Sequence, residues 1–152
     1  DGFMTRLADG RSFGEALLTP SAIYVDLIRQ CQLEQIDLHM AIHITGHGWR
    51  KLMRADDPFV YRIEVVRDFP LEIRLLIDRG LIDLKEAFVT FNMGAGFALI
   101  VNEGDVERIL GTAQRCNHVA WRAGTVIKND SKKSVEIVPL GIRYEADSLR
   151  LR

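Results

Sequence analysis

Short stretches in which apolar and polar residues alternate are interleaved with stretches of helical spacing, and this mixture most constrains the fold. The stretch 39–45 places Met40, Ile42 and Ile44 on one side. It predicts a strand, because successive strand residues point to opposite faces. The same reasoning predicts strands at 61–66, 97–102, 120–127 and 134–139, with an edge strand expected at 148–152.

Helical patterns fill the segments between these strands. Ser12 followed by Glu15 predicts a capping box for a short helix that Pro20 ends. A second helix is expected at 22–32, with Ile23, Leu27 and Ile28 among its apolar positions, and further helices at 49–54, 70–80, 83–90 and 102–115. No repeat is present. The predicted class is α+β, with a mixed or antiparallel sheet flanked by helices.

Composition excludes several classes of partner. The 152 residues suit one domain, and a hydrophobic share of 47% is typical of a globular chain. The net charge of −1 argues against a nucleic-acid partner, and the longest apolar runs, such as 97–101, are too short to span a membrane. No secretion signal is visible, so we expect a cytoplasmic protein in which Cys31 and Cys116 are reduced.

The segment "ITGHGW" (44–49) has the pattern of a strand, a glycine loop and a helix. Gly46 and Gly48 permit unusual backbone dihedrals, and the start of the next helix would offer free N–H groups. Thr45 and His47 could add donors. This pattern indicates an anion site, but a tight strand-to-helix turn requires the same glycines, so both interpretations remain open.

The histidines His39, His43 and His47 are spaced by four, which on a helix would indicate a metal site. On a strand with a rise of ~3.3 Å per residue, His39 and His43 lie roughly 13 Å apart. One zinc ion cannot bind both, because its ligand atoms lie about 2 Å away. We expect no structural metal, and we expect His43 to face a cleft.

The segment "FNMGAG" (91–96) raises a similar question. Asn92 supplies an amide, and Gly94 and Gly96 free the backbone before an apolar strand. A ligand loop and a bulge at the entry to a sheet both fit this pattern. It is neither a Walker loop nor a dinucleotide fingerprint. No pair of carboxylates and no nucleophile–histidine arrangement identifies a catalytic residue, which stays unknown.

Three motifs occur in an order and spacing that resemble one family. They are "GEALLTPSAIYV" (14–25), "HITGHG" (43–48) and "FNMGAGFALIV" (91–101), and "AWRAGTVI" (120–127) follows them. Together they resemble the C-terminal domain of aminoimidazole ribonucleotide synthetase, the phosphoribosylformylglycinamidine cyclo-ligase family. The resemblance implies that residues 1–11 are a linker from an N-terminal ATP-binding domain and that 12–152 form the C-terminal domain. The family usually has a third glycine where this chain has His47.

The resemblance also implies a chemistry. The family uses ATP to activate the amide oxygen of formylglycinamidine ribonucleotide, and the imidazole ring then closes with loss of phosphate. ATP and Mg²⁺ would be bound mostly by the N-terminal domain. The expected partners are the ribonucleotide substrate, that domain, and a second copy in a homodimer. The residues implied to bind substrate or phosphate in the cleft between the domains are Thr45, Gly46, His47, Gly48, Asn92, Gly94 and Gly96.

Two other functions remain open at this point. Related ATP-dependent enzymes that phosphorylate an oxygen or a similar acceptor include selenophosphate synthetase, thiamine monophosphate kinase, a hydrogenase maturation factor and formylglycinamidine synthetase. A stand-alone module that binds a ligand or partner without catalysis is a different class of function. We expect the 152-residue chain to fold alone, to self-associate and to be inactive in ring closure, because no residues here supply a complete ATP site.

Overall fold

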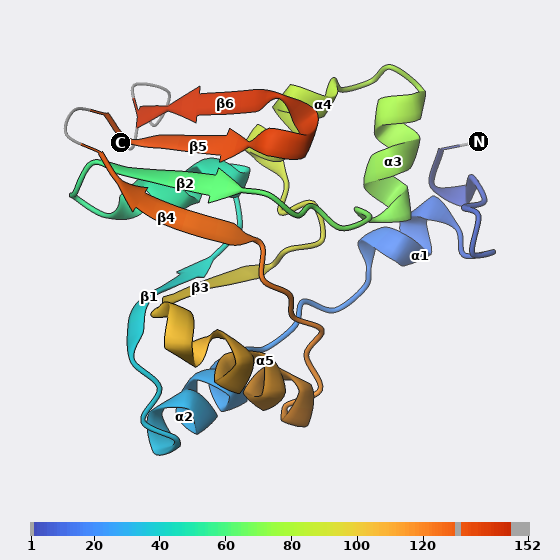
Figure 1. Ribbon diagram of the computed structural model, residues 1–152. Coiled ribbons are helices and arrows are strands. Elements are labelled where there is room, and N and C mark those ends of the chain that lie inside the picture. The colour runs from blue at the N-terminus through green and yellow to red at the C-terminus, as the bar shows by residue number, and fades with distance from the viewer. Residues whose placement is uncertain (1, 130–131, 147–152) are drawn as a thin grey trace.

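The computed structural model describes residues 2–129 and 132–146, and it confirms the α+β class (Figure 1). The helices are α1 (Phe13–Leu17), α2 (Val25–Leu33), α3 (Leu71–Asp78), α4 (Leu84–Thr90) and α5 (Val106–Arg115). The strands are β1 (Leu38–His43), β2 (Phe59–Ile63), β3 (Phe97–Val101), β4 (Gly124–Lys128), β5 (Ser134–Ile137) and β6 (Ile142–Glu145). Short 3-10 helices span Gly2–Met4, Gly48–Arg54 (η2), Glu103–Asp105 and Val138–Leu140.

The strands form two separate sheets. The larger sheet has four strands in the order β4-β2-β5-β6, and it is mixed because β2 and β5 run parallel while the other neighbours are antiparallel. The smaller sheet is the antiparallel pair β1 and β3. In Figure 1 the smaller sheet lies between the larger sheet and the helices α2 and α5.

Both faces of the smaller sheet are packed. Met40 and Ile42 of β1 contact the main core, which also holds η2, α4 and the larger sheet. Leu38 instead joins the second apolar cluster, together with α2 and α5. Alternation alone would place Leu38 and Met40 on the same face. The register shift between these two residues is a bulge. Because of it, β1 contributes side chains to both the main core and the second apolar cluster.

The short helix η2 lies inside the main core. Its Trp49, Leu52 and Met53 side chains are buried, as the apolar pattern of 49–54 predicted. Trp49 packs edge-on against Phe88 of α4, with ring centroids 5.0 Å apart. The turn that precedes η2 is thereby fixed against α4, which positions the first of the two glycine motifs.

The capping box is confirmed, since the Glu15 N–H donates to Ser12 Oγ and the Ser12 N–H donates to the Glu15 carboxylate. The helix predicted at 22–32 begins only at Val25, and the expected apolar position Ile23 is 77% exposed. Tyr24 takes the N-cap position there, and its ring stacks on Phe97.

Several strand and helix bounds also differ from expectation. The strand predicted at 120–127 begins at Gly124, because the Ala123 carbonyl accepts from two successive N–H groups before the ladder starts. The helix predicted from Asn102 opens as a 3-10 turn, and the Asn102 side chain makes no capping bond. The strand Ile142–Glu145 was not predicted. The predicted edge strand at 148–152 lies outside the described residues.

Candidate functional site

Residues 45–48 form a tight turn between β1 and η2. The Gly48 N–H donates a 3.0 Å hydrogen bond to the Thr45 carbonyl oxygen. His47 (φ +77°) and Gly48 (φ +53°) both have left-handed backbone conformations. Glycine adopts this conformation without steric cost, whereas a histidine is strained in it.

The two glycines of this turn have different roles. A Cβ atom at Gly48 would clash with the backbone of Phe88 at the end of α4, so only glycine fits there. A Cβ atom at Gly46 would meet nothing. The Gly48 N–H is used inside the turn, but in the described part of the chain the N–H groups of Gly46 and His47 donate no hydrogen bond. Both residues are exposed.

The second glycine motif is tied directly to the first. Trp49 Nε1 donates a 2.8 Å hydrogen bond to the Asn92 carbonyl oxygen. The Ile44 N–H donates a 2.9 Å hydrogen bond to the Gly96 carbonyl oxygen. The Asn92 side chain accepts from the Gly94 N–H at 2.9 Å and so holds its own loop. The structure therefore brings together two motifs that lie more than forty residues apart in the sequence.

Gly96 supports a cluster of aromatic and histidine side chains. A Cβ atom at Gly96 would clash with the Tyr24 hydroxyl. The Tyr24 ring stacks on Phe97 (4.6 Å between centroids) and on His118 (5.1 Å), and His43 lies at its edge (5.9 Å). His43, the predicted cleft residue, is exposed at this cluster. Its neighbours Tyr24 and His118 were not among the predicted site residues.

Lys51 is a further residue that sequence reasoning missed. Its side chain is buried, and its ammonium donates to the His43 carbonyl oxygen at 3.2 Å and to the Thr45 hydroxyl oxygen. Burial lowers the pKa of Lys51, and the positive charge of Arg54 lowers it further. In the sequence, the only indication of this burial was that Lys51 lies among the apolar residues Trp49, Leu52 and Met53. Burial was not predicted, because basic residues of a short helix usually face solvent.

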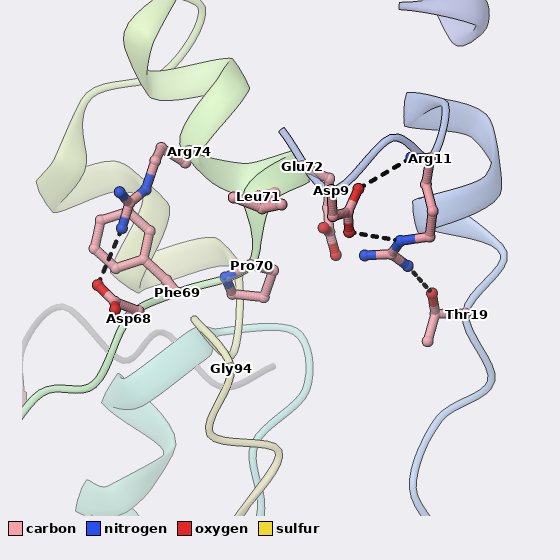
Figure 2. A pocket seen from close by; sticks show the side chains of 10 residues that line it. All are labelled: Asp9, Arg11, Thr19, Asp68, Phe69, Pro70, Leu71, Glu72, Arg74 and Gly94. Atoms are coloured by element: carbon pink, nitrogen blue, oxygen red, sulfur yellow. Dashed lines mark hydrogen bonds and ion pairs between the residues drawn. The ribbon is translucent and has the colours of Figure 1, made fainter. Parts of the chain in front are cut away.

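Gly94 has different neighbours from Gly96. It lines a pocket of about 480 Å³ between the N-terminal segment and the start of α3 (Figure 2). On one side Arg11 pairs with Asp9 and donates to Thr19, and on the other Arg74 pairs with Asp68 at 3.1 Å. Gly94 and Gly96 therefore belong to one loop but have different surroundings: Gly94 lines this pocket, whereas Gly96 is bonded to Ile44, next to the Thr45–Gly48 turn.

His39 and His43, two of the three histidines spaced by four, have different surroundings. His39 contacts Asp37 at 3.3 Å, while His43 contacts the Tyr24 ring. Among residues 2–129 and 132–146, no group of three or more His, Cys, Asp or Glu side chains could hold a metal ion. The absence of structural zinc stays a prediction.

Comparison with known proteins gives consistent relatives. The chain is 37% identical to the phosphoribosylformylglycinamidine cyclo-ligase of Methanocaldococcus jannaschii over 124 residues, which are 80% of this chain. It is 32% identical over 133 residues (88% of the chain) to that of Methanococcus maripaludis strain C7, and 34% identical over 133 residues (84%) to that of Fusobacterium nucleatum. The chain is a relative of these cyclo-ligases. No family model matches it.

The aligned part covers 36% of the M. maripaludis protein, 35% of the M. jannaschii protein and 38% of the F. nucleatum protein. The chain thus spans little more than a third of the length of these cyclo-ligases. The resemblance inferred from the motifs is confirmed, and the chain is like a C-terminal domain of that family. No helix in the described ranges has the length and apolar character needed to cross a membrane.

Proposed function

We propose that the chain is the substrate-cleft domain of an ATP-dependent cyclo-ligase that converts formylglycinamidine ribonucleotide to aminoimidazole ribonucleotide in purine biosynthesis. The observation that carries the proposal is the pairing of the two glycine motifs, through Trp49–Asn92 and Ile44–Gly96, in a chain similar to cyclo-ligases. The N–H groups of Gly46 and His47, which donate no hydrogen bond within the described residues, and the half-buried rings of Tyr24 and His118 lie beside this pairing.

In this proposal the turn holds an anionic part of the ribonucleotide. The N–H groups of Gly46 and His47 and the Thr45 hydroxyl would donate to its oxygens. The exposed side of Tyr24, His43 and His118 would lie against the remainder of the substrate. No single catalytic residue follows from this geometry.

ATP and Mg²⁺ belong to the proposed reaction, but the described residues do not fit them as a complete site. Magnesium is usually held by carboxylates and phosphates together, and no suitable group of carboxylates lies beside the turn within residues 2–129 and 132–146. We infer that an N-terminal domain supplies most of that site. ATP, when bound there, would provide the phosphoryl group that activates the amide oxygen.

Exposed apolar side chains support a further partner surface. Leu17 and Leu18 at the end of α1 are 50% and 83% exposed, and Ile23 and Val25 before and at the start of α2 are 77% and 69% exposed. An N-terminal domain or a second copy of the chain would cover such side chains. We therefore also infer a homodimer, and the biosynthetic reaction implies a cytoplasmic location.

The test measures ATP-dependent formation of aminoimidazole ribonucleotide. We expect the 152-residue chain alone to be inactive and to become active with the N-terminal domain encoded in the same reading frame. Parallel assays with selenide and with thiamine monophosphate test the related kinases and synthetases. Turnover by the chain alone, or turnover only with one of those acceptors, would contradict the proposal. Ligand binding without any turnover by the two domains would favour a non-catalytic module.

A further inference from the structure

Lys51 occupies a position that is unusual for a lysine. It lies in the middle of η2, between the core residues Trp49 and Leu52, and it is only 8% exposed. A lysine whose ammonium leaves water loses hydration, and this loss is unfavourable unless a negative charge compensates it. The partners of the ammonium therefore decide why the residue is tolerated.

Neither partner of the ammonium is charged. The His43 carbonyl oxygen accepts at 3.2 Å, and Thr45 Oγ1 is the second acceptor. Within the described ranges no carboxylate lies within salt-bridge distance of Lys51, although nine contacts between a carboxylate and another lysine or arginine occur there. The nearby charge that lowers the pKa of Lys51 is the cation of Arg54. Lys51 is thus a buried positive charge without a counter-ion in the described part of the chain.

We propose that Lys51 is the fixed positive charge of a phosphate-binding site at the Thr45–His47 turn, and that it acts through the Thr45 hydroxyl. Because Lys51 donates to Thr45 Oγ1, the hydroxyl proton of Thr45 is left to donate in another direction. Thr45, Gly46 and His47 are all exposed, and their O–H and N–H groups suit the several acceptor oxygens of a phosphate. The missing counter-ion of Lys51 is then the ligand.

This inference rests on the proposed function for the kind of ligand, a phosphorylated ribose. It assigns Lys51 as a positioning residue, because a neighbouring side chain separates it from the phosphate. The alternative is a purely structural role, in which Lys51 only ties the end of β1 to η2. The two roles differ in what removal of the charge does to binding and to stability.

The experiment measures binding of inorganic phosphate, ribose 5-phosphate and ribose by NMR titration of the 152-residue chain, followed at the Gly46 and His47 amides. We expect both phosphates to bind and ribose not to bind. Lys51→Met should weaken phosphate binding roughly 10- to 100-fold, the usual effect of losing a hydrogen bond to a charged group. Lys85→Met, a change at an exposed lysine of α4, is the matched control and should leave binding unchanged.

Thr45 tests the route by which Lys51 acts. Thr45→Val should weaken phosphate binding as Lys51→Met does, and Thr45→Ser should restore it. The double variant Lys51→Met/Thr45→Val should bind phosphate no more weakly than either single variant, because each change breaks the same Lys51–Thr45 interaction. Lys51→Met should also unfold at a temperature no lower than wild type, because an apolar side chain of similar size replaces an uncompensated charge. A structural role would instead lower that temperature and leave phosphate affinity intact.

Equal phosphate affinity in wild type and Lys51→Met would overturn the inference. If Lys51→Met does not fold, the wild-type chain gives the decision, since the Lys51 Nζ resonance must shift along the same titration curve as the Gly46 amide. No shift at saturating phosphate would also overturn it. The binding assay does not depend on ring closure. If phosphate binds through Lys51 but the two domains do not close the ring, the inference stands and the proposed function is wrong. If the ring closes but phosphate binding does not depend on Lys51, the proposed function stands and the inference is wrong.

Discussion

The indole N–H of Trp49 donates to the carbonyl oxygen of Asn92 across 43 positions of sequence, at 2.8 Å. Trp49 is also buried against Phe88 of α4. One side chain therefore fixes the helix after the first glycine motif, the loop of the second motif and the core beneath them.

Trp49→Phe tests this relationship. The substitution keeps an aromatic ring but removes the hydrogen bond to Asn92 and leaves a small cavity, so we expect a loss of about 2–3 kcal/mol in the free energy of unfolding. Urea unfolding measures the loss, and hydrogen exchange at the Gly94 amide should accelerate. Trp121→Phe is the control, because Trp121 donates only a weaker 3.2 Å bond at the surface, and it should cost less than about 1 kcal/mol. Equal losses would contradict a special role for Trp49.

The two glycines of the turn should respond differently to alanine. Gly48→Ala forces a Cβ atom into the backbone of Phe88 at a left-handed φ, so we expect more than about 3 kcal/mol of destabilisation. Gly46→Ala should change stability by less than about 0.5 kcal/mol, because nothing lies near its Cβ position. Chemical denaturation of both variants measures this contrast. It also means that Gly48 is unsuitable as a probe of binding, whereas Gly46 is suitable.

His47 lies where the resemblance to the family implies a third glycine. Its left-handed φ of +77° costs a histidine on the order of 1 kcal/mol, so His47→Gly should stabilise the chain or leave its stability unchanged. His47→Val should destabilise it, because a β-branched side chain tolerates this conformation worst. Thermal unfolding of the three proteins gives the order. If the valine variant were as stable as the glycine variant, the turn would not have this conformation in solution.

Much of this architecture was predictable because local patterns and the packing agree. The alternation of Met40, Ile42 and Ile44 gave the strand, and the Ser12–Glu15 spacing gave the capping box. The motifs "HITGHG" and "FNMGAG" were predicted to serve one cleft from their resemblance to the family, and the Ile44–Gly96 hydrogen bond places them side by side. Spacing alone left both motifs ambiguous between turn and ligand loop.

The remaining features depend on contacts that distant segments create. Tyr24 lies before the first residue of α2, and its ring stacks on Phe97 and His118. Nothing in the sequence of 22–32 reveals those two partners. Ile142–Glu145 is four residues long and becomes a strand only by pairing with β5. Lys51 has a basic side chain in a basic stretch, and its burial follows from the depth at which η2 packs.

Glu34, at the end of α2, links the two helices of the second cluster and should make stability depend on pH. Hydrogen bonds from Gln30, Thr112 and Arg115 lower the pKa of its carboxyl to about 2. In the unfolded chain a glutamate has a pKa of about 4.3. The folded pKa is therefore the lower one, so the stabilisation is present above about pH 4.3 and is lost as the pH falls towards 2.

Glu34→Gln should accordingly unfold more easily than wild type at pH 6, and the difference in free energy of unfolding should shrink steadily as the pH is lowered to 2.5. Urea unfolding at pH 6, 4, 3 and 2.5 measures the difference. Glu107→Gln, a change at an exposed position on α5, is the control and should show a much smaller pH dependence. A difference between wild type and Glu34→Gln that stays constant from pH 6 to pH 2.5 would mean that Glu34 stabilises the helix pair by its shape and not by its charge.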